Sequence, residues 1–194
     1  MPELTALRRV PEICSSTAVR ALAPAARYVL RGADEVRVAA ERALGVALPA
    51  SPCRAGIADE RAALWLGPDE WLLIGPDAAS GELAALLGGA LQGLPHSLVD
   101  VSHRQSACVL HGPQAATLLS AGCPLDLDEN AFPVGMCTRT VLAKAEVVLW
   151  RTAREAFRIE VWRSFVAYVS QFIGEAARRS TWKPGTESQL ETLS

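Results

Sequence analysis

The chain has 194 residues, half of them apolar and 21% charged, which fits one globular domain or two small units sharing a core and excludes a disordered chain. Nineteen basic and 21 acidic side chains give a net charge of −2, so neither nucleic acid nor a membrane is expected as a partner. Met1–Thr5 lack the pattern of a secretory signal, and the longest mostly apolar stretch, 83–91, is far below the roughly 18–20 residues that span a bilayer. We therefore expect a cytoplasmic protein.

The first half of the chain alternates predicted strands and helices after an irregular arm. Residues 1–25 are rich in Ala, Pro and Ser and show no clear period. Asp34 is suited to begin a helix that Gly45 ends, and Ser80 is suited to begin a second helix with an apolar stripe from Leu83 to Leu91. Apolar runs predict strands near 27–31, 62–66, 70–74, 97–101 and 106–110, the second and third of which flank a Gly-Pro-Asp turn as a hairpin.

The second half has the same mixed character. A helix is predicted between Pro113 and Gly122, since Pro suits a first helical turn and Gly a helix end. A last helix is predicted to start near Ser164, with Arg178 and Arg179 at its C-terminal end. Three further strands are predicted near 138–143, 146–151 and 156–162.

This order of elements predicts an α+β fold with a mixed, largely antiparallel sheet. Residues 1–25 would be the N-terminal arm, 26–180 a single α+β domain, and 181–194 a loose polar tail. The domain is expected to be either undivided or split into two subdomains near residue 95.

The cysteines and the residues of chemical interest give no catalytic motif. The five cysteines, at 14, 53, 108, 123 and 137, have no two-residue spacing typical of zinc or redox sites, so reduced and partly buried thiols are expected. Asp100, Ser102 and His103 lie close together, but without the strained turn of a nucleophile motif they favour a hydrogen-bonded turn. His111 and Cys108 would point to opposite faces of one strand, and no glycine-rich phosphate loop is present. We predict no catalytic, cofactor-binding or metal-binding residue in this chain.

The charge is unevenly distributed along the chain. Residues 1–137 carry ten basic and fifteen acidic side chains, whereas residues 138–183 carry nine and four. The basic segment also contains aromatic side chains, which either pack in the core or form an obligate protein interface, where Trp, Tyr and Arg are enriched. The candidate interface residues are Trp150, Arg151, Arg158, Trp162, Arg163 and Tyr168.

Several ordered motifs resemble one protein family. They are WLGPDEWLLIGP at 65–76, DVSHRQ at 100–105, GPQAATLLS at 112–120, FPVG at 132–135, TRTVLAK at 138–144 and RSFVAYV at 163–169. Together they resemble the gamma subunit of heterotetrameric sarcosine oxidase, and the resemblance covers residues 60–180.

The resemblance implies a complex of alpha, beta, gamma and delta subunits, an oxidoreductase that acts on a CH–NH group with oxygen as acceptor. Such a complex demethylates sarcosine to glycine, with hydrogen peroxide and either formaldehyde or methylene-tetrahydrofolate as further products. FAD, FMN and NAD are implied for the alpha and beta subunits and zinc for delta. The gamma fold is similar to part of the glycine cleavage T-protein, and no catalytic residue is implied for gamma.

Two functional hypotheses follow from the residues and the resemblance together. The first is a non-catalytic subunit that assembles and stabilises a sarcosine oxidase complex, which agrees with the missing catalytic motif. The alternative is a folate-binding module, because folate is anionic and the basic segment would attract it. RNA binding is disfavoured, because the chain as a whole is acidic.

Overall fold

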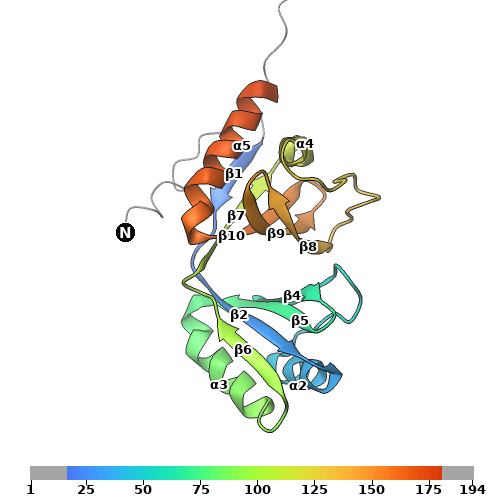
Figure 1. Ribbon diagram of the computed structural model, residues 1–194, viewed down its shortest axis with the longest axis vertical. Coiled ribbons are helices and arrows are strands. Elements are labelled where there is room, and N and C mark those ends of the chain that lie inside the picture. The colour runs from blue at the N-terminus through green and yellow to red at the C-terminus, as the bar shows by residue number, and fades with distance from the viewer. Residues whose placement is uncertain (1–16, 181–194) are drawn as a thin grey trace, which may run out of the picture.

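The secondary structure forms two antiparallel sheets that face one another, with helices on their outer faces (Figure 1). The computed structural model describes residues 17–180. The first sheet has the order β3 (Ala55–Ala58), β4 (Arg61–Gly67), β5 (Glu70–Pro76), β2 (Ala25–Gly32), β6 (His96–Asp100). The second sheet has the order β1 (Ala18–Ala21), β7 (Gln105–His111), β10 (Ala156–Trp162), β9 (Ala145–Ala153), β8 (Cys137–Leu142). The α+β prediction with largely antiparallel pairing is confirmed.

The helices cover the two sheets in pairs. Against the first sheet lie α2 (Asp34–Leu44) and α3 (Ser80–Ala90), and against the second lie α4 (Ala115–Ser120) and α5 (Val166–Ser180), with short 3-10 turns η1 (Asp77–Ala79) and η2 (Arg163–Phe165) before α3 and α5. The result is four layers in the order helix, sheet, sheet, helix. None of the helices in residues 17–180 is both long and apolar enough to cross a membrane.

Each sheet is buried on both faces, and alternate side chains of one strand pack on opposite sides. In β5, Trp71 and Leu73 pack against the helices, while Leu72 faces the opposite sheet. In β9, Leu149 packs against the outer helices, while Trp150 faces inwards. Successive side chains of a strand point to opposite faces. A strand covered on both sides is therefore apolar at most positions, as β5 and β9 are.

The ends of the predicted helices agree with the structure to within a few residues. Gly45 ends α2 in the left-handed conformation, with φ of 66°, and its N–H donates to Glu41. Asp34 is the first residue of α2 rather than its cap, which is Ala33. Likewise Ser80 is the first residue of α3. The negative charge of Asp34 in the first turn still favours the helix start, whereas the Ser80 hydroxyl lies 2.9 Å from Tyr28 Oη and does not cap α3.

The structure corrects two predictions about organisation. Residues 18–21, expected to belong to an irregular arm spanning 1–25, form β1 and pair with β7. The division near residue 95 is misplaced, because β6 completes the first sheet and β7 begins the second, so the chain crosses at 101–104. It crosses once before, at residues 22–24. Residues 1–16 of the arm and the tail at 181–194 lie outside the described residues.

The backbone at Gly56 of β3 lies too close to the segment at Ala47 for a larger side chain. A Cβ at Gly56 would lie 1.8 Å from the carbonyl oxygen of Ala47, a backbone atom that cannot swing aside. We predict that Gly56→Ala lowers the free energy of unfolding by about 3 kcal/mol, measured by urea denaturation of the full chain.

Gly88 in the exposed face of α3 is the matched control. A Cβ there meets nothing within 4 Å. Gly88→Ala should raise the free energy of unfolding by about 0.5–1 kcal/mol, because Gly is the poorer helix former. Equal effects of the two substitutions would contradict the close packing at Gly56.

Candidate functional site between the two sheets

The layer between the sheets has an apolar part and a charged part. We call it the inter-sheet layer. Its apolar part consists of buried side chains from β4, β5, β8, β9 and the crossing after β6: Ala62, Leu64, Leu72, Ile74, Val101, Cys137, Val148 and Trp150. Beside it, residues 53–55 hydrogen-bond with residues 135–137, which joins the sheets by backbone contacts as well.

A buried ion pair joins the two sheets in the charged part. Arg27 of β2 donates from Nε to Glu160 of β10 at 2.6 Å, and both residues are 1% exposed. Arg158 also binds this carboxylate, at 2.7 Å from Nη2 to Oε1. One carboxylate therefore serves two guanidinium groups, so this cluster carries a net positive charge, with Arg158 as its partly exposed member.

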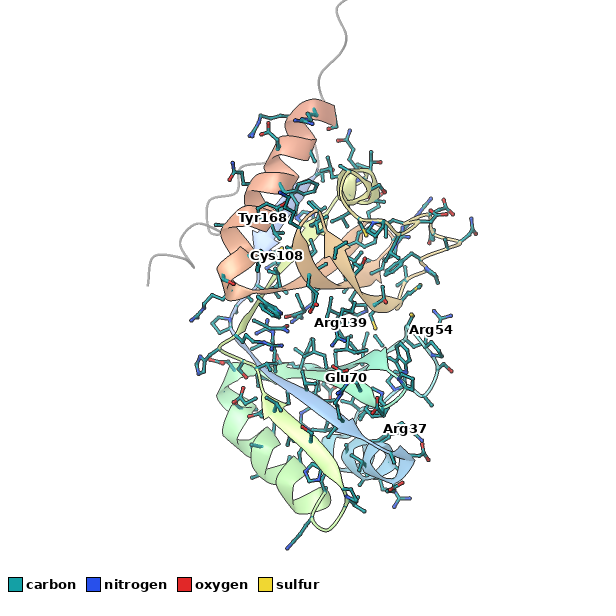
Figure 2. All side chains as sticks on the ribbon, viewed as in Figure 1. Arg37, Arg54, Glu70, Cys108, Arg139 and Tyr168 are labelled. Carbon is teal, nitrogen blue, oxygen red and sulfur yellow. The ribbon has the colours of Figure 1, made fainter. Side chains whose placement is uncertain are left out.

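A second cluster repeats the arrangement nearer the surface. Glu70 of β5 accepts from Arg31 at 2.8 Å and from Arg139 of β8 at 2.7 Å. Figure 2 shows Glu70 and Arg139 on facing sheets. Burial alone would raise the pKa of Glu70, but the hydrogen bonds and charges of Arg139 and Arg31 outweigh it and hold that pKa below its ordinary value.

An open cleft of about 400 Å³ adjoins the Glu70 cluster. Its apolar lining includes Val99 of β6, which is 50% exposed, and Trp162 at the end of β10, which is 39% exposed. The guanidinium carbon of Arg104 lies 5.0 Å from the centre of the Trp162 ring. Arg31, Arg104 and Arg139 line the cleft with Glu70 and Glu146, so its rim has an excess of positive charge.

The structure does not gather the six predicted interface residues on one surface. Trp150 and Arg151 are buried, and Arg151 donates to the carbonyls of Leu127, Phe132 and Arg154, which ties the 127–132 loop to β9. Both positions lie within a strand that is covered on both faces.

The other four predicted residues lie nearer the surface, in different places. Arg158 is half-buried near the Trp150 ring, and Trp162 lines the cleft. Arg163 is exposed beside a second cavity. Tyr168 is on α5, where its Oη accepts from the N–H of Lys144 at 3.2 Å. Their role in a subunit interface stays a prediction, and the accessible positions are Trp162 and Arg163.

Sequence reasoning missed the charged residues that join the sheets. Arg27, Glu70 and Arg139 come from strands far apart in the sequence, and no local spacing connects them. The available signal was the charged residue within an apolar run, as in RYVLR for Arg27 and RIEVW for Glu160.

The segment 100–105 forms a turn that links the sheets. Asp100 accepts from the Ser102 N–H at 2.8 Å, and hydrogen bonds from Ser102 hold the pKa of Asp100 below its ordinary value. The Ser102 hydroxyl accepts from the N–H of Arg27 at 2.9 Å. These contacts agree with the predicted hydrogen-bonded turn, and they bind the crossing to β2.

Three of the cysteines in residues 17–180, Cys108, Cys123 and Cys137, are buried in the core, and Cys53 is half-buried. Burial, with a smaller effect of Glu160, raises the pKa of Cys108 to about 12, and burial also raises that of Cys137 to about 12. Such thiols are protonated at neutral pH and poorly nucleophilic. Within residues 17–180, no group of three or more His, Cys, Asp or Glu is placed to hold a metal ion.

Solved structures of other proteins share the fold of this chain. The fold resembles the aminomethyltransferase T of the glycine cleavage system from Bartonella henselae, with a TM-score of 0.60 at 15% identity, over 92% of this chain and 52% of that chain. This likeness concerns the fold alone, and it confirms a T-protein-like arrangement of the two sheets.

The nearer matches are to sarcosine oxidase gamma subunits. The Sarcosine oxidase, gamma subunit family matches residues 31–179. The sarcosine oxidase subunit gamma of an Arthrobacter species is 38% identical over 173 residues, 81% of this chain and 83% of that protein. A chain of the heterotetrameric sarcosine oxidase from Corynebacterium sp. U-96, solved with pyrrole 2-carboxylate, has a TM-score of 0.81 at 30% identity over 94% of this chain and 92% of its own length. The chain belongs to the sarcosine oxidase gamma subunit family.

The Glu70 cluster gives a prediction about acid stability. Because its folded-state pKa is lowered, Glu70 stabilises the fold above its unfolded pKa, and this contribution is lost as the pH falls through the folded value. Glu70→Gln should therefore lower the free energy of unfolding by about 2 kcal/mol at neutral pH and by less near pH 3, measured by urea denaturation.

Glu82→Gln is the control, since its carboxylate is exposed and 3.8 Å from Arg61. It should change the free energy of unfolding by less than about 0.5 kcal/mol at either pH. A loss at Glu70 that is the same at both pH values would show that the carboxylate charge is not responsible.

Proposed function

We propose that this chain is a non-catalytic subunit of a four-subunit sarcosine oxidase, and that its role is to assemble and stabilise the complex. Its family membership supports this role. The partners would be the alpha, beta and delta subunits, in the cytoplasm.

The complex would demethylate sarcosine oxidatively to glycine. Hydrogen peroxide and either formaldehyde or methylene-tetrahydrofolate would be the further products, and FAD, FMN, NAD and zinc would be held by the partner subunits. In this scheme the present chain contributes binding surface, and no step of the reaction is assigned to its residues.

The cleft between the sheets is the observation that carries the assembly role. Val99 and Trp162 are among the most exposed large apolar side chains in residues 17–180, and both line the cleft. Exposed Trp beside Arg is typical of the residues that dominate protein interfaces. The rim has three arginines against two glutamates, so the fitting occupant is a partner segment with an apolar side chain next to a carboxylate.

Truncation of Trp162 tests this surface. We expect Trp162→Ala to weaken binding to the partner subunits by about tenfold or more, because a central Trp usually contributes strongly to an interface. Size-exclusion chromatography of the co-expressed subunits over a dilution series measures it. The rate of sarcosine oxidation per intact complex should be unchanged.

Ile57→Ala is the control, because Ile57 is a more exposed apolar residue that does not line the cleft. It should leave assembly unchanged. If the other three subunits assemble and oxidise sarcosine at the full rate without this chain, the assembly role is wrong.

Folate binding by this chain is the alternative function. The observation in its favour is again the cleft, where Arg31 and Arg104 offer partners for carboxylates and Trp162 offers a ring for stacking. Calorimetry of the full chain with tetrahydrofolate should then show micromolar binding that Trp162→Ala weakens. The absence of heat would remove this alternative.

A further inference from the structure

A second cavity lies where the chain crosses twice between the sheets. Its volume is about 240 Å³. One wall is the first crossing, residues 22–24, and another is the second, with Ser102 and His103. Arg27, Gln105, Ser106 and Arg163 also line it. The cavity is smaller than the roughly 300–1,000 Å³ of sites for drug-sized ligands, so it suits a small molecule or ion.

Arg27, one of the residues that line this cavity, has an unsatisfied hydrogen-bond donor. Its Nε donates to Glu160 and its Nη1 donates to the carbonyl of Ala25 at 3.0 Å. Its Nη2 is shielded from solvent and has no hydrogen-bond partner. A buried donor without an acceptor destabilises a fold, and a charged donor does so more strongly. The side chain is thus suited to one more acceptor than the chain supplies.

The charge balance around Arg27 favours a negative occupant. Glu160 is shared between Arg27 and Arg158, which leaves one positive charge of this cluster uncompensated. Arg163 adds a further positive charge to the lining, and Asp77 is the acidic residue of that lining. An anion would restore neutrality beside the buried cluster.

Neutral hydrogen-bonding groups complete the lining. Ser106 contributes a hydroxyl group and Gln105 a side-chain NH₂ group, both of which can donate, whereas the Ser102 hydroxyl is already hydrogen-bonded to the backbone of Arg27. Oxyanions accept several hydrogen bonds at once from guanidinium and hydroxyl groups. These donors therefore match a carboxylate or phosphate group better than a halide or a neutral ligand.

We propose that this cavity is a binding site for a small oxyanion, a carboxylate or phosphate group, held by Arg27 and Arg163 with the hydroxyl group of Ser106. Binding of a free anion here would not rest on the proposed role in assembly, whereas binding of an acidic side chain from a partner subunit would. Its occupant is either a free anion or an acidic side chain of a partner subunit, since both present the same chemistry.

Thermal unfolding of the full chain tests the site directly. Inorganic phosphate and acetate are titrated separately at constant ionic strength, with chloride as the replacement salt. A ligand that binds only the folded state raises Tm in a saturable manner, so we expect such a rise with at least one of the two anions. No saturable rise with either anion would overturn the proposal.

Variants of the lining show where the anion binds. Arg163→Gln should weaken the affinity by about tenfold, because it removes a charge-assisted contact. Arg179→Gln, at an exposed position near the end of α5, is the matched control and should leave the affinity unchanged. Ser106→Leu fills the cavity and should abolish the anion dependence while the cooperative unfolding remains. If both cavity variants respond to anions as the unaltered chain does, binding is to the surface and the proposal is wrong.

The assembled complex distinguishes the two sources of the anion. If the four-subunit complex carrying the Ser106→Leu chain loses an anion-dependent stabilisation that the unaltered complex shows, the occupant is a free anion. If the chain alone binds anions through the cavity and the unaltered complex does not, the occupant is an acidic side chain of a partner. Both results support the oxyanion site.

Discussion

The ion pair between Arg27 and Glu160 is the constraint on which the rest of the structure depends. It joins the middle of one sheet to the other at 2.6 Å, with both residues almost without contact with solvent. Removing two charges from water costs several kcal/mol each, and only good geometry offsets that cost. The ion pair forms in only one relative position of the two sheets, so any other position leaves a buried charge unpaired and is less stable. Apolar side chains alone would allow the sheets to slide against each other.

The charged and apolar parts of the inter-sheet layer therefore have different roles. The apolar side chains supply the free energy of burial, and the ion clusters fix the relative position of the sheets. The uneven charge along the sequence acquires a structural meaning here. Arg139 from the basic segment binds Glu70 from the acidic one, while Arg27 and Glu160 pair in the opposite sense, so both segments supply each sign of charge to the contacts between the sheets.

Hydrophobic periodicity predicted most elements, since long strands and amphipathic helices leave a clear signal. It missed β1 and β3, each of which has four residues, too few to show a period. It also could not show that β6 and β7, consecutive in the sequence, belong to different sheets, because pairing partners are set by tertiary contacts.

The site was predicted less well, for a related physical reason. Trp150 and Arg151 were expected at an interface from their residue types, yet β9 is covered on both faces and encloses them. Residue type indicates what a side chain can do, while exposure depends on which layers cover its strand. The arginine-to-carboxylate clusters depend on contacts between distant strands and left no local pattern to detect.

The four-layer arrangement limits where a partner or ligand can reach the space between the two sheets. Helices cover the outer faces and the sheets cover one another, so the openings of the inter-sheet layer give access to its interior. The cleft and the smaller cavity are two such openings, and Gln105 lines both.

The cavity also adjoins Arg27. An acceptor bound there would satisfy its unpaired Nη2 and strengthen the contact that sets the position of the sheets, and with it the shape of the cleft. Occupancy of the cavity and binding at the cleft are therefore expected to be thermodynamically coupled, because both favour the same placement of the two sheets.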